Sequence, residues 1–170
     1  VAELPLILNP VWSPDSQHVA YVYNNNLYVE NIMTANVTQV TSDGSDVLLY
    51  GTQSWLYEEE IFGSFAALWW NPSGSAVAYF RSDESLVRII DLPFYGETEQ
   101  YPEELSFPYP KAGTTNPTVS LFVYSPALGG TVPIVLDEEQ SGSEYYISGV
   151  LWVDDATLAV RTLDRLQQAE

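Results

Sequence analysis

Trp12-Ser13-Pro14-Asp15-Ser16 decides the fold, because the chain repeats this stretch together with the apolar residues that follow it. The second copy is Trp70-Asn71-Pro72-Ser73-Gly74, and a weaker third copy starts at Leu151-Trp152-Val153-Asp154-Asp155. In each copy Pro or Asp favours a tight turn, and the alternating apolar residues after the turn are typical of a strand. Each copy therefore predicts two strands joined by a turn, and the repetition indicates a repeat architecture.

The segment after the first copy extends this hairpin to four strands. Asn25-Asn26 ends one strand, Leu27-Tyr28-Val29 starts the next, and residues 37–41 form a later strand. Four-stranded antiparallel units repeated along a chain favour the blades of a β-propeller, with a β-sandwich as the alternative. We therefore predict an all-β fold, a partial β-propeller of two to three four-stranded blades in a single domain over residues 1–170. The candidate blades are 8–50, 67–136 with insertions, and an incomplete one over 146–170.

Three incomplete blades cannot close a ring, so their terminal strands would leave backbone N–H and C=O groups unpaired. Open edges of this kind are templates for pairing with other chains. We therefore expect a longer parent chain or oligomeric partners, with self-association to a homo-oligomer through the open strand edges. The sequence begins at Val1 rather than Met, which is typical of an excised piece and equally of a processed mature protein.

The composition argues against several classes of function. Five basic residues stand against 23 acidic ones, and the formal net charge of −18 would repel nucleic acids and anionic membrane surfaces. No apolar run approaches the roughly 20 residues of a membrane-spanning helix, so we expect no membrane contact by this segment. The chain has no cysteine and one histidine. We therefore expect no disulfide, no metal site and no cofactor.

One stretch combines an acidic triplet with aromatic residues. It reads Ser54-Trp55-Leu56-Tyr57-Glu58-Glu59-Glu60-Ile61-Phe62. Neighbouring residues on a strand point to opposite faces, so Glu59 and Glu60 can converge only on a helical turn or a bulge. We predict a short helical insertion near 55–62, with Trp55 and Phe62 on one face of it. The alternative is that the triplet is only a solvated acidic face of a very acidic protein.

Several stretches together resemble the dipeptidyl peptidase IV family of prolyl oligopeptidase-like serine peptidases. The stretch 54–62 is followed by Ala67-Leu68-Trp69-Trp70-Asn71-Pro72-Ser73-Gly74, Gln100-Tyr101-Pro102, Pro108-Tyr109-Pro110-Lys111-Ala112-Gly113 and Asn116-Pro117-Thr118-Val119. Their order and spacing are similar to that family over residues 10–126, and the remainder of the chain matches loosely. The resemblance implies an eight-bladed propeller that caps an α/β-hydrolase domain, and that hydrolase domain is absent from this chain.

The resemblance also implies a peptide-binding role for two residues. In that family the last two glutamates of the triplet hold the free amino terminus of the substrate, and this role carries over to Glu59 and Glu60. Two carboxylates can accept charge-assisted hydrogen bonds from one ammonium group. Ser54 stands where relatives commonly have Asp, and Asp164 stands where they usually have a basic residue.

Parts of the family's active site lie outside this segment. The propeller arginine falls upstream of it, and the Ser, Asp and His triad belongs to the missing hydrolase domain. The chain itself has no Gly-x-Ser-x-Gly stretch, which is the usual setting of the nucleophile in such a domain. We therefore assign no catalytic residue to this chain, and whether the parent protein is an enzyme stays open.

Two functions follow as hypotheses. The first is the non-catalytic propeller portion of a serine dipeptidyl aminopeptidase that binds peptide amino termini through Glu59 and Glu60. The second is a catalytically inactive, propeller-derived module for protein binding or assembly, which the open edges and the lack of a triad favour. Asn36 begins the sequence Asn-Val-Thr and is a candidate N-glycosylation site in a eukaryotic secretory setting. We expect an extracellular, cell-surface or periplasmic location.

Overall fold

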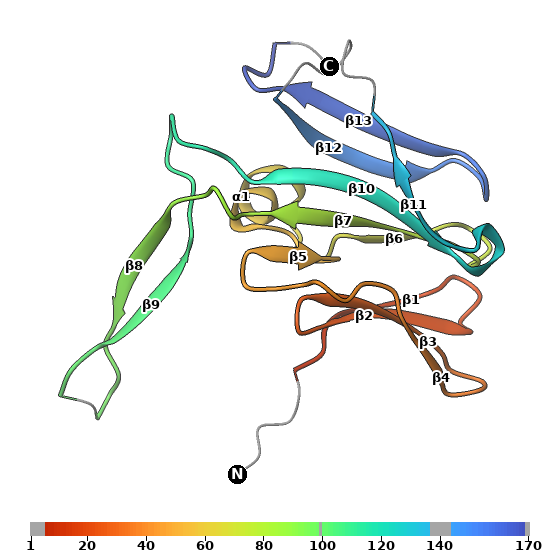
Figure 1. Ribbon diagram of the computed structural model, residues 1–170, viewed down its shortest axis with the longest axis horizontal. Helices are drawn as coiled ribbons and strands as arrows, with labels where there is room; N and C mark the ends of the chain where they lie inside the picture. The colour runs from red at the N-terminus through yellow and green to blue at the C-terminus, as the bar shows by residue number, and fades with distance from the viewer. Residues whose placement is uncertain (1–5, 99, 137–143, 169–170) are drawn as a thin grey trace.

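The protein is built from antiparallel sheets that lie side by side (Figure 1). The computed structural model describes residues 6–98, 100–136 and 144–168. Most elements in these ranges are strands, with a short helical segment at residues 55–62, which confirms the all-β prediction and its helical insertion. None of the helices in the described ranges is long and apolar enough to cross a bilayer.

The first sheet contains four strands in sequence order. They are β1 (Leu8–Trp12), β2 (His18–Tyr23), β3 (Asn26–Asn31) and β4 (Asn36–Gln39), each antiparallel to the next. Side-chain hydrogen bonds hold the turn between β1 and β2. Ser13 Oγ donates to Asp15 Oδ1 at 2.5 Å and accepts from the backbone N–H of His18 at 2.9 Å. The first copy of the repeat therefore forms the strand–turn–strand unit that its turn residues predict.

The other two copies also form a strand–turn–strand unit, with different polar side chains. The turn of the third copy is one residue shorter: the backbone N–H of Val153 donates to the carbonyl oxygen four residues on, whereas those of Ser13 and Asn71 donate to the carbonyl oxygen five residues on. In the second copy, Asn71 Oδ1 accepts from the backbone N–H of Ala76 at 3.0 Å. In the third, Asp154 Oδ1 accepts from the backbone N–H of Thr157 at 2.7 Å. Ser, Asn and Asp all have a short side chain whose oxygen can accept from a nearby backbone N–H, which explains why a tight turn forms in each copy although the residues differ.

The second sheet has β7 at its centre. Its strands are β5 (Leu48–Tyr50), β6 (Leu68–Trp70), β7 (Val77–Asp83), β10 (Thr118–Ser125) and β11 (Gly130–Ile134), with the 3-10 helix η2 (Pro126–Leu128) joining the last two. β10 pairs with one side of β7, and β11 pairs with β10. Both β5 and β6 pair with the other side of β7. The first sheet thus ends at β4, and β5, inside the first candidate blade 8–50, belongs to the second sheet.

The third sheet and a separate hairpin complete the described ranges. β12 (Tyr145–Trp152) and β13 (Leu158–Asp164) pair antiparallel, with a register shift between Ile147 and Gly149. β8 (Ile89–Phe94) and β9 (Glu103–Pro108) form a hairpin inserted between β7 and β10. This hairpin projects away from the sheets at their left end in Figure 1.

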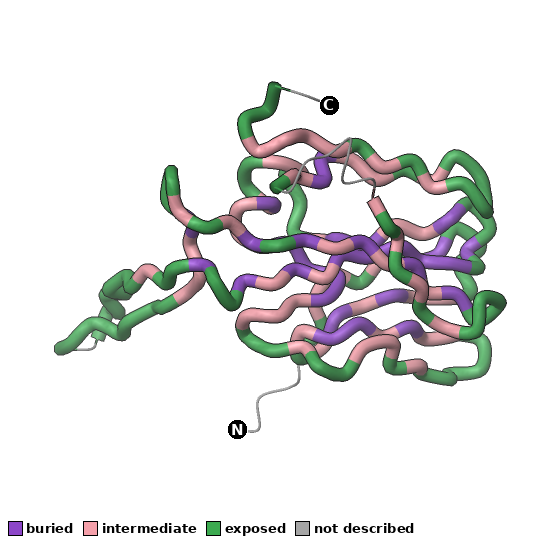
Figure 2. The backbone as a smooth tube through the Cα atoms, turned by 45° about the horizontal axis from the view of Figure 1, so that its top comes forward, coloured by how far each residue is buried: buried purple, intermediate pink, exposed green. Residues whose placement is uncertain are grey.

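The core lies on both faces of β7, which is buried for most of its length (Figure 2). Because side chains alternate along a strand, Val77 and Tyr79 pack with Leu27 of the first sheet. Ala78 and Phe80 point the other way and pack with Ile147 of the third sheet. The second sheet is therefore held between its two neighbours.

Candidate functional site

The acidic segment interrupts a strand of the second sheet. β5 and β6 run in the same direction along one side of β7, with Tyr50 opposite Arg81 and Leu68 opposite Tyr79. The chain leaves this line after β5 and returns before β6, and an antiparallel bridge between Thr52 and Ala66 closes the neck of the excursion. The segment with the acidic triplet therefore projects from the edge of the second sheet that β5 and β6 form, opposite the edge formed by β11.

The excursion contains α1 (Trp55–Tyr57), which continues directly into the π-helix η1 (Glu58–Phe62). Ser54 is the N-cap, and its Oγ accepts from the backbone N–H of Tyr57 at 3.4 Å. Ser54 therefore supports the helix at the position where relatives commonly have Asp. The segment ends at Gly63, whose φ of 62° is in the left-handed region that glycine adopts without strain. π-Helical turns are rare and occur frequently at functional sites.

Trp55 and Phe62 do not share a face of this segment, contrary to the prediction. The Trp55 ring packs on Tyr109, with 4.2 Å between centroids. Phe62 instead packs on Trp69 and Phe80, each at 5.7 Å. Hydrogen bonds in a π-helix join residues five apart, so its turns are wider than those of an α-helix. A spacing of seven residues therefore no longer returns to the same side.

Both neighbouring sheets hold the acidic segment in place. From β1, Asn9 Nδ2 donates to Thr52 Oγ1 at 3.1 Å and lies 3.2 Å from the Gly51 carbonyl oxygen. From β12, the backbone N–H of Ile147 donates to Tyr57 Oη at 3.3 Å. Tyr57 is 1% exposed, and burial raises the pKa of its hydroxyl well above the ordinary value. The Tyr57 side chain therefore stays neutral. Its buried ring and its hydrogen bond anchor the residue that directly precedes the triplet.

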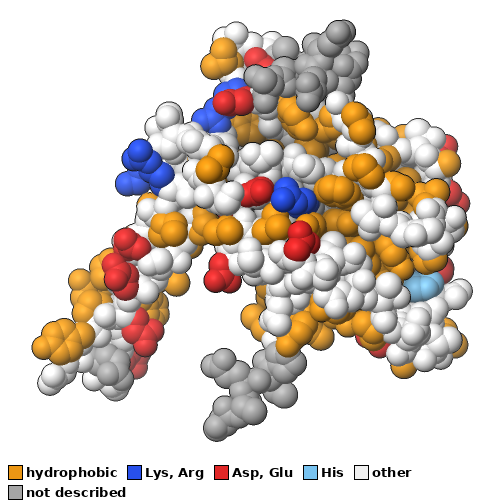
Figure 3. Space-filling view, in the orientation of Figure 1, with side chains coloured by type: hydrophobic (Ala, Val, Ile, Leu, Met, Phe, Trp, Pro, Cys, Tyr) orange, Lys and Arg blue, Asp and Glu red, His pale blue; other side chains and the backbone are white. Residues whose placement is uncertain are grey.

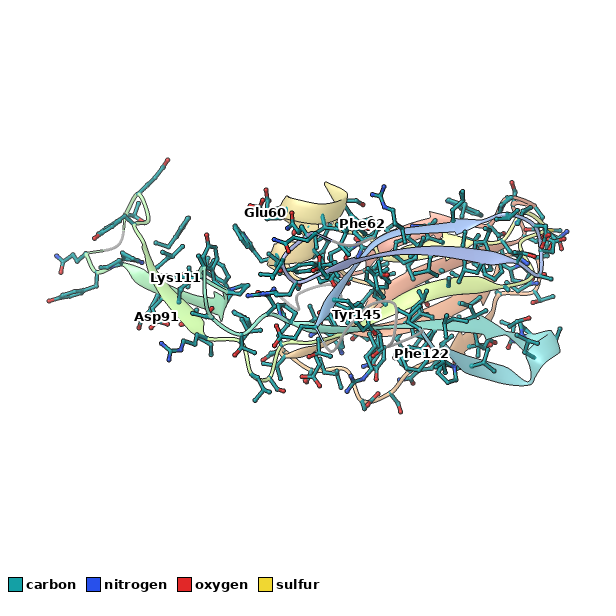
Figure 4. All side chains as sticks on the ribbon, turned by 90° about the horizontal axis from the view of Figure 1, so that it is seen from above. Glu60, Phe62, Asp91, Lys111, Phe122 and Tyr145 are labelled. Carbon is teal, nitrogen blue, oxygen red and sulfur yellow. The ribbon has the colours of Figure 1, made fainter. Side chains whose placement is uncertain are left out.

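The structure places Glu59 and Glu60 next to each other on η1, where both are exposed, while Glu58 is half-buried. In Figure 4, Glu60 lies on the side of the coil away from the sheets and Phe62 on the side toward them. Within the described ranges, no ion pair joins these three carboxylates to a basic side chain. The segment thus combines an anchored apolar side with an acidic side open to a cationic group.

Asn36 lies elsewhere. It is the exposed first residue of β4, and its side chain lines a hollow of about 390 Å³ that also contacts His18 and Trp70. The Asn36 position is accessible to modification, and its glycosylation stays a prediction.

Three contacts of the acidic segment were not predicted from the sequence. They are those made by Asn9, by Tyr57 with Ile147, and by Trp55 with Tyr109. Tyr57 and Tyr109 both lie in stretches that carry the family resemblance, so that resemblance offered a signal for them. Asn9 has a φ of 52°, a conformation that Asn tolerates better than most residues. No local sequence pattern predicts that Asn9 contacts Thr52 of the neighbouring sheet.

Comparison with known proteins agrees with this architecture. A family model described as the dipeptidyl peptidase IV (DPP IV) N-terminal region matches residues 4–170. Dipeptidyl peptidase 4 of Felis catus is 37% identical over 164 residues, covering 92% of this chain and 21% of the relative. Dipeptidyl aminopeptidase B of Saccharomyces cerevisiae is 40% identical over 159 residues, covering 91% of this chain and 19% of the relative. This chain thus spans about a fifth of the length of these relatives.

The crystal structure of Porphyromonas gingivalis dipeptidyl peptidase 4 matches with a TM-score of 0.87 and 36% identity, covering 98% of this chain and 23% of that chain. Its match and that of the family model confirm that the antiparallel sheets are part of a β-propeller. The chain belongs to the family of dipeptidyl peptidase IV N-terminal regions.

Proposed function

We propose that this chain is the propeller portion of a dipeptidyl aminopeptidase, in which Glu59 and Glu60 hold the protonated amino terminus of a peptide substrate. One observation carries the proposal. The two carboxylates are adjacent and exposed on a π-helical turn whose other side is pinned by Tyr57 and Phe62. A rigid turn with two anions suits a small cation that has several hydrogen-bond donors.

The strength of such a clamp depends on shelter from water. A hydrogen bond to a charged group contributes about 1.5–3 kcal/mol, whereas an exposed ion pair contributes only about 0–1 kcal/mol. Glu59 and Glu60 are both exposed on this chain. Tight binding of the amino terminus therefore requires a further part of the protein to cover the site, and an α/β-hydrolase domain is the partner that we propose for this role.

The clamp would also explain dipeptide specificity. If the amino terminus is held at a fixed distance from the nucleophile of the hydrolase domain, only the bond at that distance is cleaved. The peptide must then have a free amino group, so the enzyme becomes an exopeptidase. The names of two relatives, dipeptidyl peptidase 4 and dipeptidyl aminopeptidase B, describe peptidases of this kind, which supports the proposal for the protein that carries this chain.

The test is a pair of substitutions in the full-length protein. Glu59→Gln combined with Glu60→Gln should reduce the kcat/KM of dipeptide release by about 100-fold or more, since two charge-assisted hydrogen bonds are lost. Glu103→Gln combined with Glu104→Gln is a matched control, because these glutamates are also adjacent and exposed but lie on the β8–β9 hairpin. Equal kcat/KM values for the two double variants would refute the clamp.

A second function, an assembly module without catalysis, is favoured by the β8–β9 hairpin. This hairpin forms its own two-stranded sheet and exposes many large apolar side chains (Figure 3). They are Ile89, Leu92, Phe94, Tyr95, Tyr101 and Leu105, exposed by 46–82%. Monomeric proteins rarely expose so many apolar residues together without a partner. Under this proposal a second copy of the protein covers the hairpin, giving a homo-oligomer.

Two measurements separate these functions. A Ser in a Gly-Trp-Ser-Tyr-Gly-like stretch downstream of this chain supports the peptidase, whereas its replacement supports the assembly module. For the hairpin, Leu92→Ser with Leu105→Ser should lower the molar mass measured by light scattering, because these two residues face each other across the strands. An unchanged mass would contradict self-association through the hairpin.

The peptidase proposal also includes a location outside the cytosol. Cell fractionation of the full-length protein tests this location.

A further inference from the structure

Tyr146 connects several segments beside the acidic one. Its hydroxyl oxygen accepts hydrogen bonds from Asn116 Nδ2 at 2.8 Å and from Arg165 Nη1 at 3.0 Å. Asn116 belongs to the loop before β10, and Arg165 directly follows β13. Two donors from segments far apart in the sequence therefore fix the position of the Tyr146 ring.

The Tyr146 side chain in turn supports Tyr57. The two rings lie 6.4 Å apart between centroids, with an interplanar angle of 59°, which is within the range of favourable aromatic pairs. The residue after Tyr146 is Ile147, whose backbone N–H donates to Tyr57 Oη. Tyr57 immediately precedes the acidic triplet. A shift of Tyr146 would therefore move both the ring and the backbone donor that hold the start of η1.

Arg165 holds Tyr146 in place through several contacts. Besides Tyr146 Oη, its Nη2 donates to the carbonyl oxygen of Thr114 at 3.1 Å, and its guanidinium carbon lies 5.9 Å from the Tyr146 ring centroid. The carboxylate of Glu144 is 4.0 Å away and its side chain is 75% exposed, so this ion pair contributes little. Most of the hydrogen bonding of Arg165 is thus directed at neutral oxygen atoms of the structure itself.

Packing does not replace these hydrogen bonds. A hollow of about 380 Å³ adjoins Arg165 and is lined by Asn116, Glu144 and Tyr146 among others. The Arg165 side chain is 31% exposed, so packing encloses the guanidinium only in part. The planar fork of Arg can donate to two acceptors at once, whereas the single ammonium of Lys cannot match that geometry.

We propose that Arg165 and Tyr146 are positioning residues for the acidic segment: through Tyr57, they set where Glu59 and Glu60 lie. The effect on peptide binding rests on the proposed function of these glutamates, whereas the effect on the segment itself does not. The third sheet would then control the binding site without touching the peptide. This role requires neither residue to contact the reacting groups.

The first test measures the segment directly, by hydrogen exchange of backbone amides 55–63 in the full-length protein. Tyr146→Phe retains the ring and removes the oxygen that accepts both hydrogen bonds, and Arg165→Met removes the donors. Both variants should exchange about 10-fold faster over 55–63, since loss of a hydrogen bond weakens local closure by this order. Arg88→Met, an exposed arginine at the base of the hairpin, is the control and should leave exchange unchanged. Unchanged exchange in the first two variants would overturn the proposal.

The second test measures dipeptide release. Arg165→Met should lower kcat/KM for a substrate with a free amino terminus by about 10-fold, mostly through a higher KM. In the background of Glu59→Gln with Glu60→Gln, Arg165→Met should cause no further loss, because it acts through the same clamp. An equal loss in both backgrounds would overturn the proposal in favour of general damage to the fold.

Two further outcomes keep the test decisive. Arg165→Lys retains charge and length but not the bidentate geometry, so it should have an intermediate effect on exchange and serves if Arg165→Met does not fold. A wild-type exchange rate over 55–63 in Arg165→Lys and in Tyr146→Phe would count against the proposal. If the two glutamate substitutions themselves leave kcat/KM unchanged, the clamp has failed, and the exchange data alone decide whether Arg165 positions the segment.

Discussion

The indole N–H of Trp152 donates a hydrogen bond to the backbone carbonyl oxygen of Trp69 at 2.9 Å, which ties the third sheet to the second. The same relationship occurs one repeat earlier, where Trp70 Nε1 donates to the carbonyl oxygen of Val11 at 3.0 Å. In both cases the acceptor is the residue just before the Trp of the preceding copy. The repeated Trp therefore sets the register between neighbouring sheets, in addition to marking the start of a turn.

The first prediction concerns this connection. Trp152→Phe removes the N–H and leaves the Trp69 carbonyl without that donor, so it should lower the free energy of unfolding by about 1–3 kcal/mol. Trp55→Phe is the control, because within the described residues the Trp55 indole N–H makes no hydrogen bond, and its cost should be about 1 kcal/mol or less. Urea unfolding followed by circular dichroism measures both. Equal costs would contradict a connecting role for Trp152.

The second prediction concerns the end of the acidic segment. Gly63 has a positive φ, and no atom lies within 4 Å of the place where a Cβ would be. Any cost of Gly63→Ala therefore comes from the backbone conformation, which disfavours a residue with a side chain by about 1–2 kcal/mol. Amides 55–62 should exchange about 5- to 30-fold faster. Gly63→Asn should be milder, because Asn tolerates this conformation, and an equal effect of Ala and Asn would argue against this explanation.

The third prediction is a pH dependence of stability. Glu84, between β7 and the hairpin, is 5% exposed, and burial raises the pKa of its carboxyl from 4.5 to about 7. The folded protein therefore binds the proton more tightly than the unfolded chain. The contribution of neutral Glu84 to stability is complete below about pH 4.5 and is lost as the pH rises through about 7.

Glu84→Gln should abolish this dependence. The variant should be more stable than the wild type by about 1–3 kcal/mol at pH 8, and this difference should vanish near pH 4. Thermal unfolding at both pH values measures it. A stability difference that stays constant between the two pH values would show that Glu84 ionisation does not oppose folding.

Whether the sequence predicted a feature depends on how far apart in the chain the interacting residues lie. The turns at Ser13, Asn71 and Asp154 are held by side chains a few residues from their partners, so their residue types suffice to predict them. The helical insertion was also predicted. Its π-helical turn was not, because Tyr57 is fixed by Ile147, 90 residues away.

The same reasoning applies to the edge of the second sheet and to the candidate site. The pairing of β5 with β7 depends on a partner strand about 30 residues further on, and no local pattern specifies it. Glu59 and Glu60 were identified through the family resemblance, whereas Arg165 and Tyr146 act through contacts that only the folded chain brings together. Interactions between residues close in the sequence were thus predictable. The long-range contacts that hold the acidic segment in place were not.

The central claim is that Glu59 and Glu60 together grip the amino terminus of a peptide. The most direct measurement is a crystal structure of the full-length protein with a bound dipeptide product. We predict that the ammonium nitrogen lies about 2.7–3.2 Å from a carboxylate oxygen of each of these two residues. A dipeptide bound with its ammonium nitrogen held by other groups, and with both glutamates facing solvent, would contradict the account.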